Sequence, residues 1–256
     1  MALIAMCMYD TLENKKSACT RITILSLSKT IDLDEHRVIV VDNASTCPMA
    51  KETKSIAEGL GFEVITMPEN VGTAKGINEA WKRRRENEHL IKMDNDVYFH
   101  QSGWATKMED AIEQDPNIGI IGLKRKDLLE SPDRTDIFRS ELKMLPHKAG
   151  EPWIAVEVVN HVMGTCQMYN SKLIDVIGGL YQMDGLYGFD DSLAAVRCNV
   201  AGFYSCFLSN VDIDHIDAGD TAHQSWKEKY AMSKMQEYNK VKQEYLNGTR
   251  SIYIPL

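Results

Sequence analysis

One strand constrains the fold of this chain more than any other segment, Arg37-Val-Ile-Val-Val-Asp42. Its four consecutive β-branched apolar residues show no polar alternation, so both faces of the strand are expected to be covered. Strands covered on both faces belong to parallel sheets flanked by helices. The segment therefore predicts an α/β fold.

The first half of the chain repeats this pattern. Further apolar strands are expected at 2–8, 62–66, 89–93 and 118–123, and they alternate with helical patterns at 20–27, 51–60, 73–85 and 104–114. Such alternation predicts βαβ units around a mostly parallel central sheet.

The pattern changes after residue 123. Residues 124–152 are polar and are expected to form a long loop. Later segments are expected to be a strand at 155–169, helices at 171–177 and 190–200, a strand at 203–213 and a helix at 221–246. We divide the chain into one domain, 1–220, with a nucleotide-sugar-binding half (1–123) and an acceptor half (124–220), and a helical tail, 221–256. An aromatic stripe on the last helix favours packing on the domain, and a homodimer through it stays possible.

Composition excludes some classes of protein. The net charge is −8, which argues against a protein that mainly grips a nucleic-acid backbone. The six cysteines fit no zinc-site spacing, and no apolar run approaches the about 18 residues of a membrane span. The first residues carry no basic leader. We expect reduced thiols, no stable membrane anchor and a cytoplasmic location.

Acidic residues follow the strand at 89–93, in the order Asp94-Asn95-Asp96. Ligands bind beyond the carboxyl ends of strands in open α/β sheets. Two carboxylates one residue apart can converge on Mg²⁺ or Mn²⁺, which prefer oxygen ligands and bridge to diphosphates. The alternative is a helix cap followed by a solvated turn.

Two more segments suit a nucleotide. Asp42 ends its strand, where it can accept hydrogen bonds from a ribose or base, or simply form an Asx turn. The segment Asn70-Val-Gly72-Thr-Ala-Lys75-Gly-Ile-Asn78 opens a helix, so its N–H groups and Lys75 could meet a phosphate. Small residues chosen for helix packing explain it equally well. It matches neither a P-loop nor a dinucleotide fingerprint.

The last two candidate segments lie in the second half. Asp190 and Asp191 begin a predicted helix, where they can be caps or one can act as a general base. His215 follows the strand at 203–213, and it is chemically suited to be a third metal ligand.

Together, these five segments resemble, in order and approximate spacing, the family-2-like GT-A glycosyltransferases over about residues 1–217. The resemblance implies a GT-A fold, which is a Rossmann-like three-layer α/β fold, here followed by a C-terminal helix. It also implies transfer of a sugar from a UDP-sugar to an acceptor hydroxyl, with Mn²⁺ or Mg²⁺ as cofactor and with inversion at the anomeric carbon.

Carried over by position, the resemblance assigns roles. The metal ligands would be Asp96, His215 and, directly or through water, Asp94. The catalytic base would be Asp190, or else Asp191. The nucleotide-sugar site would include Tyr9, Asp10, Asp42, Asn70, Gly72, Lys75, Asp94 and Asn95. Two positions depart from the family: Phe189 stands where its Glu is expected, and Cys7-Met8-Tyr9-Asp10 replaces its usual Pro-Thr-Tyr-Asn.

The acceptor stays open at this point. It can be a saccharide, a lipid carrier or a protein. Basic residues at 82–85 and 124–126, with Arg134, Arg139 and Lys143, keep hydroxymethylated DNA as an alternative. A sugar nucleotidyltransferase would need a Gly-rich loop after the first strand, which is missing. A non-catalytic module that binds sugar nucleotides remains the other class.

Overall fold

The computed structural model describes residues 1–129, 141–146, 153–216 and 221–256. In the described residues, the strands are β1 (Ala2–Met8), β2 (Arg37–Asp42), β3 (Glu63–Thr66), β4 (His89–Met93), β5 (Val97–Phe99), β6 (Ile118–Arg125), β7 (Glu141–Leu145), β8 (Ile154–Val159), β9 (Cys166–Tyr169) and β10 (Tyr204–His215). They join into one sheet in the order β3-β2-β1-β4-β9-β6-β10-β8-β7, and β5 pairs with β10.

The first four strands are parallel, which places the carboxyl ends of β1, β2 and β4 side by side along one end of the strands, called here the carboxyl edge of the sheet. Met8 of β1 pairs with Asp42 of β2, and Met6 pairs with Met93 of β4. The loops that follow these strands therefore begin side by side. This edge of the sheet carries most of the residues that the sequence singled out.

The second half of the sheet is mixed. β9 lies antiparallel between β4 and β6, β10 runs parallel to β6, and β7 and β8 form an antiparallel pair at the far edge. The predicted α/β class is confirmed. The parallel pairing is continuous only through β3, β2, β1 and β4.

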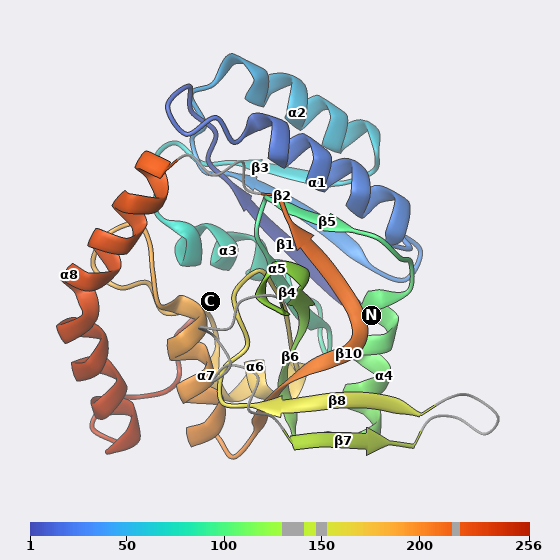
Figure 1. Ribbon diagram of the computed structural model, residues 1–256, viewed down its shortest axis with the longest axis vertical. Coiled ribbons are helices and arrows are strands. Elements are labelled where there is room, and N and C mark those ends of the chain that lie inside the picture. The colour runs from blue at the N-terminus through green and yellow to red at the C-terminus, as the bar shows by residue number, and fades with distance from the viewer. Residues whose placement is uncertain (130–140, 147–152, 217–220) are drawn as a thin grey trace.

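Helices cover both faces, which gives three layers (Figure 1). Helices α1 (Ser17–Thr30), α2 (Pro48–Gly59) and α4 (Trp104–Gln114) pack on one face, and α3 (Thr73–Trp81), α6 (Ser171–Ile177) and α7 (Asp190–Val200) pack on the other. Residues of β1 alternate between the two cores, since successive side chains of a strand point to opposite faces. The remaining helices are α5 (Lys126–Leu129) and α8 (Thr221–Leu246).

The C-terminal tail packs on the second half of the chain. Tyr245 and Val241 of α8 are buried against Met183 and Leu193. The chain then returns, and Ile254 bridges to Gly178 beyond α6. The predicted aromatic stripe therefore contributes to the core at its C-terminal end.

Several predicted boundaries were wrong. The segment 155–169 is two strands, β8 and β9, because the chain leaves one strand position and returns between β4 and β6. The segment 124–152 is not simply a loop: β6 extends to Arg125, and α5 and β7 follow. β7 is an exposed edge strand. Its mostly exposed residues do not show the regular apolar alternation that would have predicted a strand.

Within the described residues, no helix has the length and apolar character to cross a bilayer.

Candidate active site

The pairing of β5 with β10 brings the ends of two distant segments together. Val97 pairs with His215, and the Ile216 N–H donates to the carbonyl of Asp96 over 2.8 Å. The imidazole Nε2 of His215 consequently lies 3.3 Å from Oδ2 of Asp96. Two of the three predicted metal ligands are thus neighbours.

Asp96 is a strongly paired carboxylate. Lys16 Nζ, at the start of α1, lies 2.9 Å from Oδ2. Burial raises the pKa of Asp96, but the hydrogen bond and charge of His215 and the charge of Lys16 outweigh it and hold that pKa below its usual range. The other oxygen, Oδ1, is buried and has no hydrogen-bond partner in the part of the chain that the structure describes. An ionised carboxylate with one unused oxygen beside an imidazole suits a divalent cation.

Asp94 faces a different partner. Its Oδ1 lies 3.7 Å from Nζ of Lys92, a buried lysine of β4. Burial raises the pKa of Asp94, Lys92 opposes that rise, and the Asp96 carboxylate adds to it. The described residues hold no group of three His, Cys, Asp or Glu side chains close enough for one metal ion. The structure therefore brings Asp96 and His215 together and turns Asp94 toward Lys92.

The two base candidates begin α7, and the turn before them is strained. Phe189 has φ 62°, in the left-handed region, and its ring stacks on Tyr238 of α8 at 4.5 Å. Non-glycine residues hold such backbone only where packing supports it. The stacking therefore helps to aim Asp190 and Asp191 into the site.

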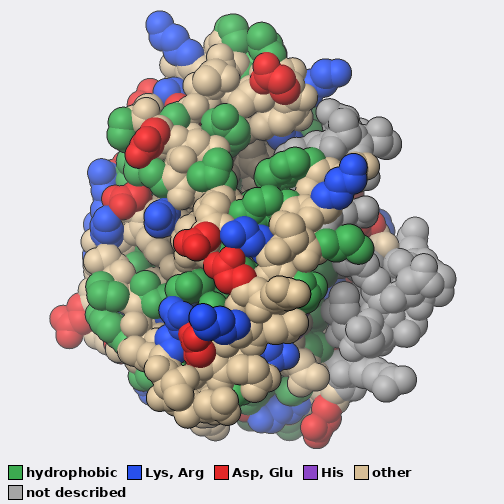
Figure 2. All heavy atoms as spheres, turned by 90° about the vertical axis from the view of Figure 1, so that its left-hand side faces the viewer, with side chains coloured by type: hydrophobic (Ala, Val, Ile, Leu, Met, Phe, Trp, Pro, Cys, Tyr) green, Lys and Arg blue, Asp and Glu red, His purple; other side chains and the backbone are tan. Residues whose placement is uncertain are grey.

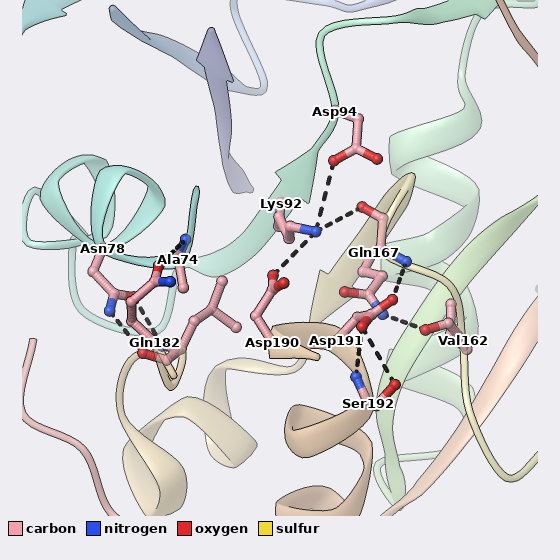
Figure 3. A network of polar contacts seen from close by, with 12 residues as sticks. Ala74, Asn78, Lys92, Asp94, Val162, Gln167, Gln182, Asp190, Asp191 and Ser192 are labelled. Atoms are coloured by element: carbon pink, nitrogen blue, oxygen red, sulfur yellow. Dashed lines mark hydrogen bonds and ion pairs between the residues drawn. The ribbon is translucent and has the colours of Figure 1, made fainter. Parts of the chain in front are cut away.

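These two carboxylates have different surroundings (Figure 3). Oδ2 of Asp190 lies 3.2 Å from Nζ of Lys92. Asp191 accepts hydrogen bonds from the N–H groups of Gly164 at 2.9 Å and Ser192 at 2.7 Å, and lies 3.3 Å from Nε2 of His161. Burial raises the pKa of Asp191, but the hydrogen bond and charge of His161 bring it below its usual range.

Asp10 and Asn95 are placed together inside the protein. The Asp10 side chain is fully buried and accepts a hydrogen bond from Thr20 Oγ1 at 2.9 Å. Asn95 Nδ2 donates to the same Thr20 hydroxyl at 2.8 Å. Both residues thus tie the first and fourth strand ends to α1, while Tyr9 next to them stays partly exposed.

Asn43, which follows Asp42, joins the loop after β2 to the segment at 70–72. Asp42 pairs with Lys54 of α2 at 2.6 Å. Asn43 Nδ2 donates to Asn70 Oδ1 at 2.8 Å, and its Oδ1 accepts from the Val71 N–H at 3.0 Å. The predicted nucleotide loops after β2 and β3 therefore form one hydrogen-bonded unit.

The N-terminus of α3 is capped by a side chain. Gln182 Oε1 accepts from the Ala74 N–H at 3.0 Å. Gly72 has φ +90°, and a Cβ there would lie 2.7 Å from Gln182 Oε1, so the glycine is required on both counts. Lys75 is exposed and lines a surface hollow with Lys82 and Leu256. The lining of this hollow includes none of the predicted carboxylates.

Sequence reasoning missed several residues that the site contains: Lys16, Lys92, His161, Gly164 and Gln182. Lys92 carried a signal, because a charged residue inside the apolar run His-Leu-Ile-Lys-Met is costly to bury without a partner. The other four lie in loops or at helix ends, where no local pattern separates a site residue from a solvated one.

A family model settles the family of this chain. The model described as "Glycosyl transferase family 2" matches residues 4–178. The chain belongs to glycosyl transferase family 2. The matched range contains Asp42, the segment at 70–78 and Asp94–Asp96. No curated protein matches this family 2 chain.

Solved structures of glycosyltransferases share the fold. The chain is similar to a mannosyltransferase from Pyrobaculum calidifontis in complex with GDP-Man and Mn²⁺, with a TM-score of 0.62 at 15% identity over 88% of this chain and 59% of that one. It is also similar to residues 1–349 of S. aureus TarS in complex with UDP-GlcNAc, with a TM-score of 0.60 at 16% identity, over 85% and 61%.

A third similar structure is GalNAc-T7 with UDP, GalNAc and Mn²⁺, with a TM-score of 0.60 at 11% identity over 84% of this chain and 43% of that one. At these identities the likeness confirms the GT-A fold. The chain spans less than two thirds of the length of each of these three structures.

Proposed function

We propose that this protein transfers a sugar from a nucleotide-diphosphate sugar, with UDP-sugars as first candidates, to an acceptor hydroxyl with inversion, and that it uses Mn²⁺ or Mg²⁺. The observation that supports this most is the pair of contacts made by Lys92, whose Nζ lies 3.7 Å from the Asp94 carboxylate and 3.2 Å from the Asp190 carboxylate. It links the segment proposed to hold the donor to the helix proposed to carry the base. Similar structures hold GDP-Man, UDP-GlcNAc or UDP.

Asp96 and His215 would hold the metal, with Asp94 reaching it, or the ribose, through water. A divalent ion bound there would neutralise the negative charge that develops on the nucleotide diphosphate as it leaves. Lys16 would have to release Oδ2 of Asp96 or share it, because its ammonium lies 2.9 Å from that oxygen.

For the nucleotide, we propose the loops after β1, β2 and β3. Tyr9 offers a partly exposed ring, and Asp42 a carboxylate held by Lys54. Asn43 fixes Asn70 and Gly72 beside them. The Gln182 cap favours a packing role for the N-terminus of α3 over phosphate binding.

Asp190 is proposed as the base that accepts the proton of the attacking hydroxyl. Asp191 already accepts two backbone N–H bonds and faces His161, which lowers its basicity. Among the described residues, Oδ2 of Asp190 has no hydrogen-bond partner, and it faces Lys92 (Figure 3). Asp191 remains the second candidate.

The basic clusters favour an acceptor other than DNA. Lys82, Arg84 and Arg125 pair with Glu79, Asp175 and Asp127, respectively. Similarly, Arg83 pairs with Glu63, Lys124 with Glu157, and Lys143 with Asp115. Arg134 and Arg139 lie outside the described residues. The neighbouring carboxylates offset the positive charge of these side chains and so weaken their attraction to a phosphate backbone. We therefore propose a hydroxyl of a saccharide, lipid carrier or protein as the acceptor.

The surface around α8 supports the same view. Figure 2 shows this side of the molecule, where basic and acidic side chains are interspersed among apolar ones. Strong, salt-sensitive binding to hydroxymethylated DNA, lost between about 50 and 200 mM salt, would overturn this choice of acceptor.

A thermal-shift screen of nucleotide sugars with and without Mn²⁺ tests the donor half of the proposal. A ligand of the native state raises stability as RT ln(1 + [L]/Kd). We expect one UDP-sugar to raise the Tm only with Mn²⁺, and we expect D96N to lose that shift. A non-catalytic module would bind the donor but release no UDP from it, and release of UDP therefore separates the two classes.

A further inference from the structure

Lys92 is a buried cation in the middle of a sheet strand. Its neighbours in β4, Leu90, Ile91 and Met93, are core residues, and its own side chain is only 5% exposed. A buried charge is very costly unless it is paired and hydrogen-bonded. Its partners therefore define what this lysine does.

The ammonium has three partners from three segments (Figure 3). Nζ lies 3.2 Å from Oδ2 of Asp190 on α7 and 3.7 Å from Oδ1 of Asp94, and it donates to the carbonyl of Gly164 at 3.1 Å. An ammonium group has three N–H donors. One of them donates to the Gly164 carbonyl, and the two carboxylates are ion-paired with the ammonium.

Gly164 connects this cation to the second carboxylate. Its carbonyl accepts from Lys92, while its N–H donates to Oδ2 of Asp191 at 2.9 Å. A Cβ at position 164 would lie 2.4 Å from Nζ of Lys92 and 3.2 Å from Oδ2 of Asp191. Only glycine lets the ammonium approach the peptide so closely.

The Lys92 side chain lies between two carboxylates from different segments. Without the ammonium, the carboxylates of Asp190 and Asp94 would face each other across a buried space and repel. Asp190 would then turn away from its present position.

We propose that Lys92 is a positioning residue that holds the Asp190 carboxylate next to Asp94, aimed at the acceptor hydroxyl, and that Gly164 sets the place of its ammonium. The proposal rests on the proposed glycosyltransferase function and on Asp190 as its base. Lys92 itself touches no substrate. It acts on turnover through Asp190 and leaves donor binding largely intact.

The experiment measures UDP or GDP release in the presence of Mn²⁺, with whichever of UDP-glucose, UDP-galactose, UDP-GlcNAc and GDP-mannose the wild type hydrolyses. We expect K92M to lower kcat at least about 100-fold, the scale of a lost general base, with the KM for donor within about threefold. K124M is the matched control, since Lys124 is a similarly buried lysine paired with a glutamate outside the site. Its kcat is expected to stay within about twofold.

Two further variants keep the test decisive if K92M folds poorly. G164A retains every charge but displaces the ammonium, and it is expected to lower kcat about tenfold or more. K92A lacks three carbons and the amine, so added propylamine is expected to restore part of its kcat, while propanol is not.

The outcomes separate the two proposals. A wild type that turns over none of these donors overturns the proposed function, and this inference falls with it. An active wild type together with wild-type kcat in K92M or G164A overturns only the role of Lys92. A loss confined to KM also overturns it, because that result would make Lys92 a donor-binding residue.

Discussion

Nε2 of His215 lies 3.3 Å from Oδ2 of Asp96, although one residue ends β10 and the other follows β4. The antiparallel pairing of β5 with β10 creates this contact, since Val97 is the partner of His215. The paired strands thus hold together the carboxylate and the imidazole that we propose as metal ligands.

We expect H215A to weaken Mn²⁺ binding at least about tenfold, since even outer-shell partners of a metal site are worth 10–100-fold in affinity. Isothermal titration calorimetry of the purified protein with MnCl₂ measures the dissociation constant for Mn²⁺. H100A is the matched control, because His100 follows β5 and, like His215, pairs with an aspartate, here Asp214 at 2.9 Å. Equal affinities in both variants would remove His215 from the metal site.

The His161–Asp191 pair predicts a pH dependence of stability. Burial lowers the pKa of His161, but the hydrogen bond and charge of Asp191 outweigh it and raise that pKa above its ordinary value. Stability from this pair is therefore complete below about pH 6.5, the unfolded pKa of histidine, and it is lost as the pH rises through the higher folded value.

Accordingly, the difference in Tm between wild type and H161Q should be larger at pH 6 than at pH 8.5, as measured by calorimetry in low-salt buffer. The double variant H161Q/D191N should show no such change relative to D191N across the same range. A wild-type advantage that grows with pH would contradict the raised pKa.

Arg197 predicts a large effect on stability. Its guanidinium is fully buried and donates to the carbonyls of Ile177, Gly179 and Ile252, which ties α7 to the C-terminal tail. R197M would remove this donor from the carbonyls of Gly179 and Ile252, at about 1–3 kcal/mol each, while the Ile177 carbonyl keeps the Ile254 N–H. We expect the free energy of unfolding to fall by about 3 kcal/mol or more in urea titrations.

The control for that measurement is R21M, which breaks the more exposed ion pair of Arg21 with Glu52 and should cost about 1 kcal/mol or less. Similar losses in the two variants would mean that the tail is not held through Arg197.

Gln182 offers a test of the helix that the sequence proposed for phosphate binding. Removing its cap from α3 in Q182A should cost about 1 kcal/mol of stability. The affinity for UDP with Mn²⁺ should stay unchanged, because the cap and the metal ligands are separate. A marked gain in affinity for UDP would show instead that Gln182 competes with a phosphate for the same N–H groups.

The local pattern of the chain predicted much of the fold. Consecutive apolar β-branched residues at 38–41 required a covered parallel strand, and the alternation with helices required the βαβ order. Acidic residues directly after such strands had to meet at one edge, as Asp42 and Asp94 do. These features follow from short-range periodicity, so they can be read without a structure.

The tertiary structure decided what these side chains face. β9 follows β6 in the sequence but lies between β4 and β6 in the sheet. No local sequence pattern indicates that β4 and β6 are not direct neighbours. That insertion brings Gly164, His161 and the start of α7 up to Lys92.

The sequence by itself thus determined the α/β class and the edge where chemistry can occur, since both depend on residues close together in the chain. Only the tertiary structure decided that Asp94 faces Lys92, that Asp96 faces Lys16 and His215, and that Gln182 caps α3. Such contacts join residues far apart in sequence. A buried charge or helix end needs a hydrogen-bonding or charged partner, and the tertiary fold decides which residue is close enough to be that partner.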